Sequence, residues 1–451
     1  MKPETTDQLV AQLDSPDAAE RRSALEQLAA ARPHAQPPRR PEINLHCHTF
    51  FSYNAYGYSP SRFAWEAWDY GLEVAGIVDF DVLDGVVEFL EAGRLLGLKT
   101  VAGFETRVFI REYSDKVINS PHEPGVCYLA GVGFTAPPET DTEAARVLAS
   151  MAACARRRNT RMLDRINEHL DPVSVDYEQD VLPLTPAGNA TERHMLVAYE
   201  RAAREALPAP DDLTAFWAEK LDEPIKKVRG LPNDAVALKN LIRGRLMKHG
   251  GVGYAAPDEG SFPALEDVVE MTLACGSVPS GCWLDGTNPG EADPLEHFAF
   301  FRSKGIPTIT IIPDRNWNLR DSDERALKVG NLHRALEAAA QLQLPVLVGT
   351  EMNKAGQKFV DTFAAPEMEP YRQSFLDGAH VAWGHTLLKM TAGVGLTGDW
   401  ADRHFGGDAR ARNEFFRRIG EAPYPNADAM SALAATGPDT DPVTLSRLVQ
   451  A

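Results

Sequence analysis

Two histidines placed one residue apart give the first sign of chemistry in this sequence of 451 residues. His46 and His48 lie in the run Asn-Leu-His-Cys-His-Thr at 44–49, which is predicted to form a strand. Alternate side chains of a strand point to the same side of a sheet, so both imidazoles can reach one metal ion. The pair also fits one histidine that caps a turn and another that packs in the core.

Acidic residues stand at the ends of three later hydrophobic runs. Asp79, Glu105 and Glu351 each follow directly on apolar or β-branched residues. Taken alone, each acid fits a solvated loop residue or a helix N-cap. Their repetition beside the His-x-His motif is typical of a metal centre, because carboxylate and imidazole are the ligands that divalent ions share.

The elements that must position these residues alternate along the chain. Strands are predicted at 43–49, 74–80, 100–109, 126–134, 278–286, 308–313 and 345–351, with a further candidate at 380–387. Helices are predicted at 61–70, 86–96, 143–170, 265–273, 295–304 and 324–342. Strands that alternate with helices indicate a parallel sheet, and about seven such units indicate an α/β barrel. The functional residues are then expected at the carboxyl ends of the strands.

The barrel is expected to span residues 42–390, with three additions. Residues 1–41 read as a short helical prefix followed by a linker with four prolines between 32 and 41. The segment 200–263 is rich in Lys, Asp and Pro and lacks strand patterns, so it is predicted to be a helical insertion. Residues 391–451 are predicted to form a helical C-terminal tail.

Composition narrows the classes of partner. The chain has 46 basic and 64 acidic residues, which gives a net charge of −18. An acidic surface repels nucleic-acid phosphates and anionic lipid headgroups, so neither nucleic acid nor a membrane is expected as a partner. The five cysteines are scattered without a C-x-x-C pair, and no targeting or membrane-spanning run is present. A cytoplasmic protein is therefore expected, with self-association left open.

The order of these motifs resembles the PHP family, the polymerase and histidinol phosphatase superfamily. The resemblance covers about residues 42–390 and rests on the segments 45–49, 77–81, 103–105, 128–134, 192–194 and 349–353. It implies a distorted (β/α)7 barrel that holds two or three divalent ions and hydrolyses phosphoesters. It further implies that His46 and His48 bind one ion, that Glu105 bridges it to a second, and that His194 binds the second. Asp79 matches the acidic member of the family's T-D-H-D turn.

Departures from the family pattern lower the expected number of ions. Phe80 replaces the histidine of that turn, Asn353 replaces another, and Tyr128 stands where a histidine is common. One or two ions of zinc, manganese or iron are therefore expected. Glu351, which replaces an aspartate of the family motif, still offers an oxygen ligand.

The predicted function is hydrolysis of a small phosphorylated substrate by a metal-bound hydroxide. Asp79 or Asp285 is expected to carry the proton, and Arg315 is expected to hold the anionic group. Arg107 and Lys354 are further candidates for that contact. Asp285 fits an N-cap equally well, and each basic residue alone fits a solvated loop charge.

Two other functions and two other features remain open at this point. The same metal platform could hydrolyse a C–N bond, as in an amidohydrolase, or the barrel could bind a ligand or metal without turnover. Phe80 and Asn353 favour the non-catalytic alternative.

The arginines between 156 and 165 are interpreted as a solvated helix face. His385 is a weaker ligand candidate that equally fits the core.

Overall fold

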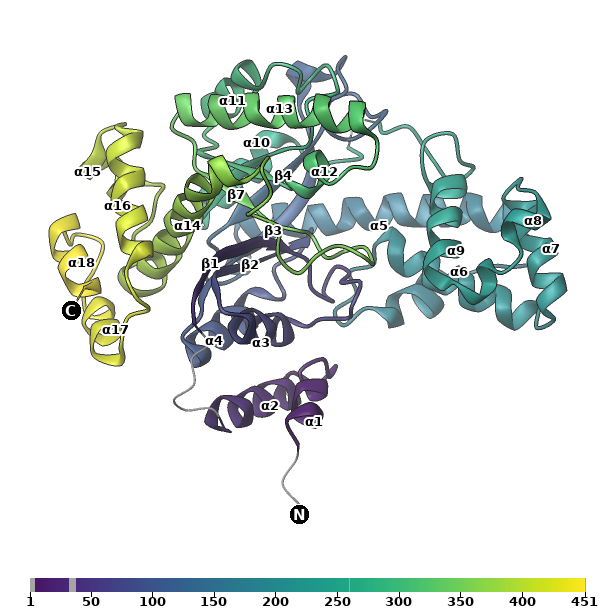
Figure 1. Ribbon diagram of the computed structural model, residues 1–451, viewed down its shortest axis with the longest axis horizontal. Coiled ribbons are helices and arrows are strands. Elements are labelled where there is room, and N and C mark those ends of the chain that lie inside the picture. The colour runs from purple at the N-terminus through teal and green to yellow at the C-terminus, as the bar shows by residue number, and fades with distance from the viewer. Residues whose placement is uncertain (1–4, 32–37, 259, 451) are drawn as a thin grey trace.

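Seven strands form a single sheet at the centre of the computed structural model, which describes residues 5–31, 38–258 and 260–450 (Figure 1). The strands are β1 (Arg40–Cys47), β2 (Leu72–Phe80), β3 (Lys99–Phe109), β4 (Val126–Val132), β5 (Val278–Trp283), β6 (Thr308–Ile311) and β7 (Val346–Val348). They pair in sequence order from β1 to β7. Nearly all of their residues are buried because helices pack outside the sheet and side chains fill it from within. The predicted seven-stranded barrel is confirmed.

Strand direction differs from the prediction at one place. β4 runs antiparallel to both β3 and β5, whereas every other neighbouring pair is parallel. A parallel connection needs a crossover, usually a helix, but only a single 3-10 turn at Arg111–Tyr113 lies between β3 and β4. The expectation of an entirely parallel sheet was therefore wrong. As a consequence, Arg107 pairs with Tyr128 at the carboxyl end of β3.

The barrel closes between β7 and β1 by irregular hydrogen bonds. The Glu351 N–H donates to the His46 carbonyl at 2.7 Å, and the His48 N–H donates to the Glu351 carbonyl at 2.9 Å. Gly349 permits this contact, because a Cβ there would lie 2.3 Å from the His46 nitrogen. The buried Asn44 side chain donates to Thr350 Oγ1 at 2.9 Å and adds a side-chain link across the same seam. This seam places the ends of the first and last strands together.

Helices α3 (Pro60–Tyr70), α4 (Val86–Leu96), α10 (Leu265–Ala274), α11 (Pro294–Ser303) and α13 (Ser322–Gln341) cover the outside of the sheet (Figure 1). Local signals explain their limits. The Ser59 side chain accepts a hydrogen bond at the start of α3, and Gly71 ends that helix at a φ of 88°. The bounds lie within two residues of the predicted helical segments.

A second hydrophobic core lies to one side of the barrel. It contains buried residues from Leu163 to Met247. They come from the second half of α5 (Glu143–Leu170) and from α6 (Glu192–Ala206), α7 (Pro210–Lys220), α8 (Ile225–Val228) and α9 (Ala235–Ile242). Figure 1 shows α5 extending from the sheet toward these helices. This helical lobe, residues 163–247, thus begins earlier along the chain than the segment 200–263.

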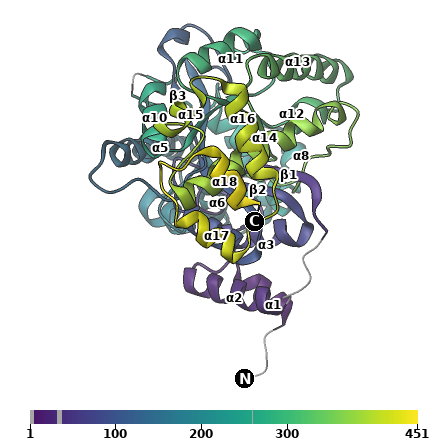
Figure 2. The same ribbon diagram turned by 90° about the vertical axis from the view of Figure 1, so that its left-hand side faces the viewer.

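The C-terminal helices gather on the side of the molecule that faces the viewer in Figure 2, away from the helical lobe. Helix α14 (Arg372–Ala392) contacts the beginning of β7, where a Cβ at Gly378 would lie 2.1 Å from the Val346 carbonyl oxygen. Helices α15 (Asp399–Phe405), α16 (Ala409–Glu421), α17 (Ala427–Ala434) and α18 (Pro442–Val449) follow. The candidate strand at 380–387 was wrong, because this stretch is the middle of α14 and is buried on all sides. Periodicity cannot distinguish such a run from a buried strand.

The N-terminal helices α1 (Thr6–Gln12) and α2 (Ala18–Ala31) pack beside α3 and α4. A buried ion pair between Arg21 and Glu88, at 2.5 Å, joins α2 to α4. Most of the proline-rich linker, 32–37, lies outside the described residues. A search of the described helices finds none with the length and apolarity that a bilayer crossing requires.

Candidate metal centre

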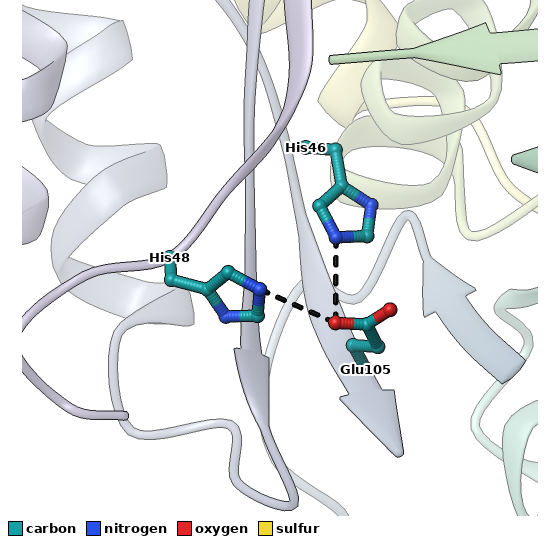
Figure 3. A group of neighbouring side chains, drawn as sticks. All are labelled: His46, His48 and Glu105. Carbon is teal, nitrogen blue, oxygen red and sulfur yellow. Dashed lines mark ion pairs between the residues drawn. The ribbon is translucent and has the colours of Figure 1, made fainter. Parts of the chain in front are cut away.

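His46, His48 and Glu105 meet inside the barrel, as Figure 3 shows. The Nε2 atoms of His46 and His48 lie 3.4 Å and 3.2 Å from the same carboxylate oxygen of Glu105. His46 is in β1, His48 directly follows that strand, and Glu105 is in β3. All three side chains are buried, and their ligand atoms lie within 4.8 Å of one another. Among the residues that the structure describes, this is the one such group of three.

Three of the four imidazole nitrogens of this cluster lack hydrogen bonds. Both ring nitrogens of His46 and Nε2 of His48 are buried without a hydrogen-bond partner. A buried polar atom without a partner costs free energy, about 1–3 kcal/mol each. The two Nε2 atoms, which face one carboxylate oxygen, fit a divalent cation, for which neutral imidazole and carboxylate are regular ligands. His46, His48 and Glu105 are therefore suited to hold a metal ion.

The pKa of Glu105 depends on the two histidines, and the pKa of His48 depends on Glu105. Burial opposes ionisation of Glu105, but His46 and His48 lower the pKa of its carboxyl well below the usual range. Burial likewise opposes protonation of His48, but the Glu105 carboxylate raises the pKa of that imidazole. The ionised form of the acid is thus the stable one, which is the form that binds a cation.

Asp79 lies behind His48 and is not in the cluster. The Thr49 N–H and hydroxyl donate to its two oxygens at 2.7 Å and 2.6 Å, and the Ser52 hydroxyl donates to Oδ1 at 2.7 Å. The Ser52 oxygen in turn lies 3.2 Å from His48 Nδ1. Asp79 was predicted as a ligand and proton carrier, but its oxygens are engaged by these donors. The contacts fix the ring of His48 with Nε2 toward Glu105.

Phe80 and Glu351 lie on two other sides of the cluster. Phe80 stacks on the His48 ring with a centroid separation of 4.2 Å. Glu351 Oε1 accepts a 2.6 Å hydrogen bond from Arg315, and Oε2 accepts one from Gln357 at 3.1 Å. The backbone of Glu351 has a φ of 67°, a strained conformation for a residue with a side chain. Glu351 thus lies beside the cluster as the partner of Arg315.

The remaining predicted residues lie elsewhere. His194 is outside the cluster because its Nδ1 accepts the Thr191 N–H at 3.0 Å, as part of the cap that starts α6. Burial lowers the pKa of His194 to about 4, so the ring is neutral. Asp285 contacts Lys328 at 3.0 Å and accepts two hydrogen bonds from Thr287. Its carboxylate therefore organises a loop and does not line the site cavity described below.

A cavity of about 480 Å³ opens beside the cluster, with Glu105 in its wall. Glu105, Phe80 and Glu351 line it on the barrel side, and residues of α5, α6 and the segment after α9 line it on the side of the helical lobe. Eight basic and five acidic side chains take part. The basic ones are Arg107, Arg158, Arg193, Arg243, Lys248, Arg315, Lys354 and Lys358. The wall is thus net basic in a chain whose net charge is −18.

Five of these basic residues were not predicted as site residues: Arg158, Arg193, Arg243, Lys248 and Lys358. Arg158 was assigned to a solvated helix face, but its side chain enters the cavity. Its position offered a signal, since it lies seven residues after the buried Met151 and four before Met162 on the same helical stripe. Arg193, Arg243 and Lys248 gave no such signal, because the helical lobe alone brings them to the cavity. Arg243 and Lys248 both contact Glu192, and despite burial they lower the pKa of this acid to about 2.

No family model matches the chain, and no curated protein matches it. Two solved structures have a similar fold. An amidohydrolase from Chromobacterium violaceum, solved with bound sulfate and no metal, is 14% identical, with a TM-score of 0.49 over 75% of this chain and 96% of that one. A candidate metal-dependent phosphoesterase from Bifidobacterium adolescentis is 18% identical, with a TM-score of 0.45 over 74% of this chain and 96% of that one. Identities at this level carry no information on substrate. The sheet of seven strands agrees with the barrel fold predicted from the sequence.

Proposed function

We propose that this protein is a metal-dependent hydrolase that acts on small phosphoesters. The observation that carries the proposal is the convergence of two imidazole Nε2 atoms, neither with a hydrogen-bond partner, on one carboxylate that lines a net basic cavity. The imidazoles and the acid suit a divalent ion, and the basic wall suits an anionic substrate. Zinc, manganese and iron all remain candidates for the ion, because each accepts nitrogen and oxygen ligands.

A divalent ion held by His46, His48 and Glu105 would act as a Lewis acid toward the phosphoryl group. Ser52 and Asp79 keep the His48 ring in the orientation that presents Nε2 to that position. Phe80 covers one face of His48 and excludes water from it. Arg315 lines the cavity beside the cluster and presents a guanidinium suited to phosphate oxygens.

The charge of the cavity wall favours a phosphoester over a neutral amide. Arg315 is paired with Glu351, but Arg107, Arg158 and Lys354 add positive charge from other sides. A positive, low-dielectric cleft attracts anions, and a neutral amide gains nothing from it. A cytoplasmic location and self-association remain predictions from the sequence alone.

The proposal is tested by metal analysis and turnover of the purified protein. We expect bound or restorable divalent metal, and hydrolysis of phenyl phosphate that falls at least 100-fold in His46→Ala together with the metal content. His404→Ala, which removes an exposed histidine in α15, is the matched control and should leave both unchanged. Hydrolysis of an anilide in place of the phosphate would assign an amidohydrolase. The proposal would be overturned if the purified protein contained no metal and showed no turnover after addition of zinc, manganese or iron.

A further inference from the structure

Two arginines of the cavity wall are held by one phenyl ring. The guanidinium of Arg107 lies 4.6 Å from the centroid of Phe262, and that of Arg158 lies 4.2 Å from the same centroid. Arg107 belongs to β3 and Arg158 to α5, so barrel and helix each contribute one of them. Phe262 is buried and orders both side chains through cation–π contacts. This arginine pair, Arg107 and Arg158, is rigid and faces the cavity.

The arginine pair carries positive charge that its own contacts do not neutralise fully. Arg107 contacts the Glu123 carboxylate at 2.9 Å. Arg158 contacts the Phe262 ring and the Ser261 carbonyl oxygen, to which it donates at 2.6 Å, and the buried Asp81 carboxylate lies near enough to favour its charge. Burial, together with the neighbouring charge of Arg107, lowers the pKa of Arg158 to about 10. The environment thus disfavours the charge on Arg158, and a bound anion would stabilise it.

The arginine pair lies apart from the metal centre but shares its cavity. Arg107 is two residues beyond Glu105 on β3, so both side chains project from the same face of the strand. Two residues of a strand span about 7 Å. One small molecule can therefore place one group at Glu105 and the imidazoles, and a second at the guanidinium groups.

We propose that the arginine pair binds a second anionic group of the substrate, about 7 Å from the phosphoryl group at the metal centre. The inference rests on the proposed function and narrows its substrate class to phosphoesters that carry a further carboxylate or phosphate. Guanidinium groups bind both anions through paired N–H donors, so the two sources share one recognition chemistry. Arg158 is the specificity residue, and Arg107 supports it from the barrel.

Ligands that differ by one anionic group provide the test. Benzylphosphonate, 4-carboxybenzylphosphonate and para-xylylenediphosphonate are not hydrolysed, and their binding is measured by calorimetry at fixed salt. We expect either added anion to tighten binding to the parent about tenfold or more. Arg158→Met should reduce this gain to less than about threefold, and Arg158→Lys should retain part of it. Arg161→Met removes an exposed arginine of the same helix and should keep the full gain.

Each outcome bears on the proposal. An equal gain in parent and Arg158→Met, or no gain in the parent, would overturn the assignment. If only one of the two added anions tightens binding, the substrate class narrows to phosphoesters that carry that anion. If Arg158→Met fails to fold by circular dichroism, Phe262→Leu replaces it, since loss of the ring should reduce the gain as well. Absence of phenyl phosphate turnover with the gain intact would reject the hydrolase and leave the anion site standing.

Discussion

The two ends of the barrel bury similar side chains in different arrangements. At the end covered by α14, the Lys99 ammonium contacts Glu73 at 2.5 Å and donates to the Gly420 carbonyl at 2.9 Å. His380 faces the same carboxylate at 3.4 Å. At the opposite end, Glu105 has two imidazoles as neighbours and no lysine or arginine among its described ion pairs.

The difference shows which buried polar groups indicate a site. Imidazole nitrogens without hydrogen bonds occur at both ends, including His380 Nδ1 and His385 Nε2. His385 packs at the α14 end, where its Nδ1 accepts the Leu396 N–H at 2.9 Å. Burial and Lys389 lower the pKa of His385 to about 3, so this ring is a neutral core residue. At the α14 end a resident lysine supplies the cation, whereas at the site end the ligand atoms converge on a place for an external one.

Replacing the site carboxylate should have the largest effect. In Glu105→Gln, the cluster loses its one negative charge, so we expect metal content below a tenth of the parent and phenyl phosphate turnover reduced about 1000-fold or more. Elemental analysis and steady-state kinetics measure the two. Glu73→Gln removes the carboxylate at the other end and should keep both values. Retained metal in Glu105→Gln would refute the contrast between the ends.

Removing the resident cation should act on stability. Lys99→Met leaves a partly buried Glu73 without its cation, and breaking a buried pair costs about 3 kcal/mol. That cost equals about a 150-fold shift of the unfolding equilibrium, measured by urea denaturation. Turnover per folded molecule should remain that of the parent, because α14 lies away from the cavity. A loss of turnover without a loss of stability would contradict the assignment of a purely structural role to Lys99.

The residues behind the cluster should have an intermediate effect. Asp79→Asn weakens the hydrogen bonds that orient Thr49, Ser52 and hence His48, so we expect metal affinity to fall about 10- to 100-fold without being abolished. Competition with a fluorescent chelator measures the affinity. Asp84→Asn, which changes an exposed acid in the loop after β2, is the control. Complete loss of metal would instead make Asp79 a direct ligand.

The smallest effect concerns pH. Burial raises the pKa of Glu73, but His380 and Lys99 outweigh it and lower the pKa to about 2 from an ordinary value of 4.5. A depressed pKa contributes stability that is fully present above 4.5 and is lost as the pH falls toward 2. The free energy of unfolding should therefore fall less steeply below pH 4.5 in Glu73→Gln than in the parent. Identical slopes in urea titrations would disprove the contribution.

Local patterns predicted the elements well where periodicity was long and its ends were marked. The limits of α4 and α5 coincide with the predicted 86–96 and 143–170. The direction of β4 was missed, because strand patterns carry no information on the orientation of a neighbour. His380 to Leu387 was misassigned, because a run buried on all sides has the same composition in a helix and in a strand.

The candidate site divides in the same way. Alternation along one strand was enough to predict that His46 and His48 share a face, and Glu105 followed from its place at the end of a neighbouring run. His194 was predicted from the family resemblance and Asp285 from its place at the end of a strand, but local partners engage both of them. Thr191 caps a helix with the first, and Lys328 and Thr287 bind the second. Sequence spacing identifies residues of the right chemical type, but it does not show whether neighbouring groups already bind their side chains.

By itself, the sequence determined the barrel, its helices and the strand that carries the imidazoles, because these depend on periodicity and on neighbours a few residues apart. Only the tertiary structure decided which charges meet. It paired Arg315 with Glu351, placed Asp79 behind His48 and brought Arg158 across to Phe262. Electrostatic partners are chosen by distance in space, and the packing of a helical lobe against a barrel sets that distance with no trace in local sequence.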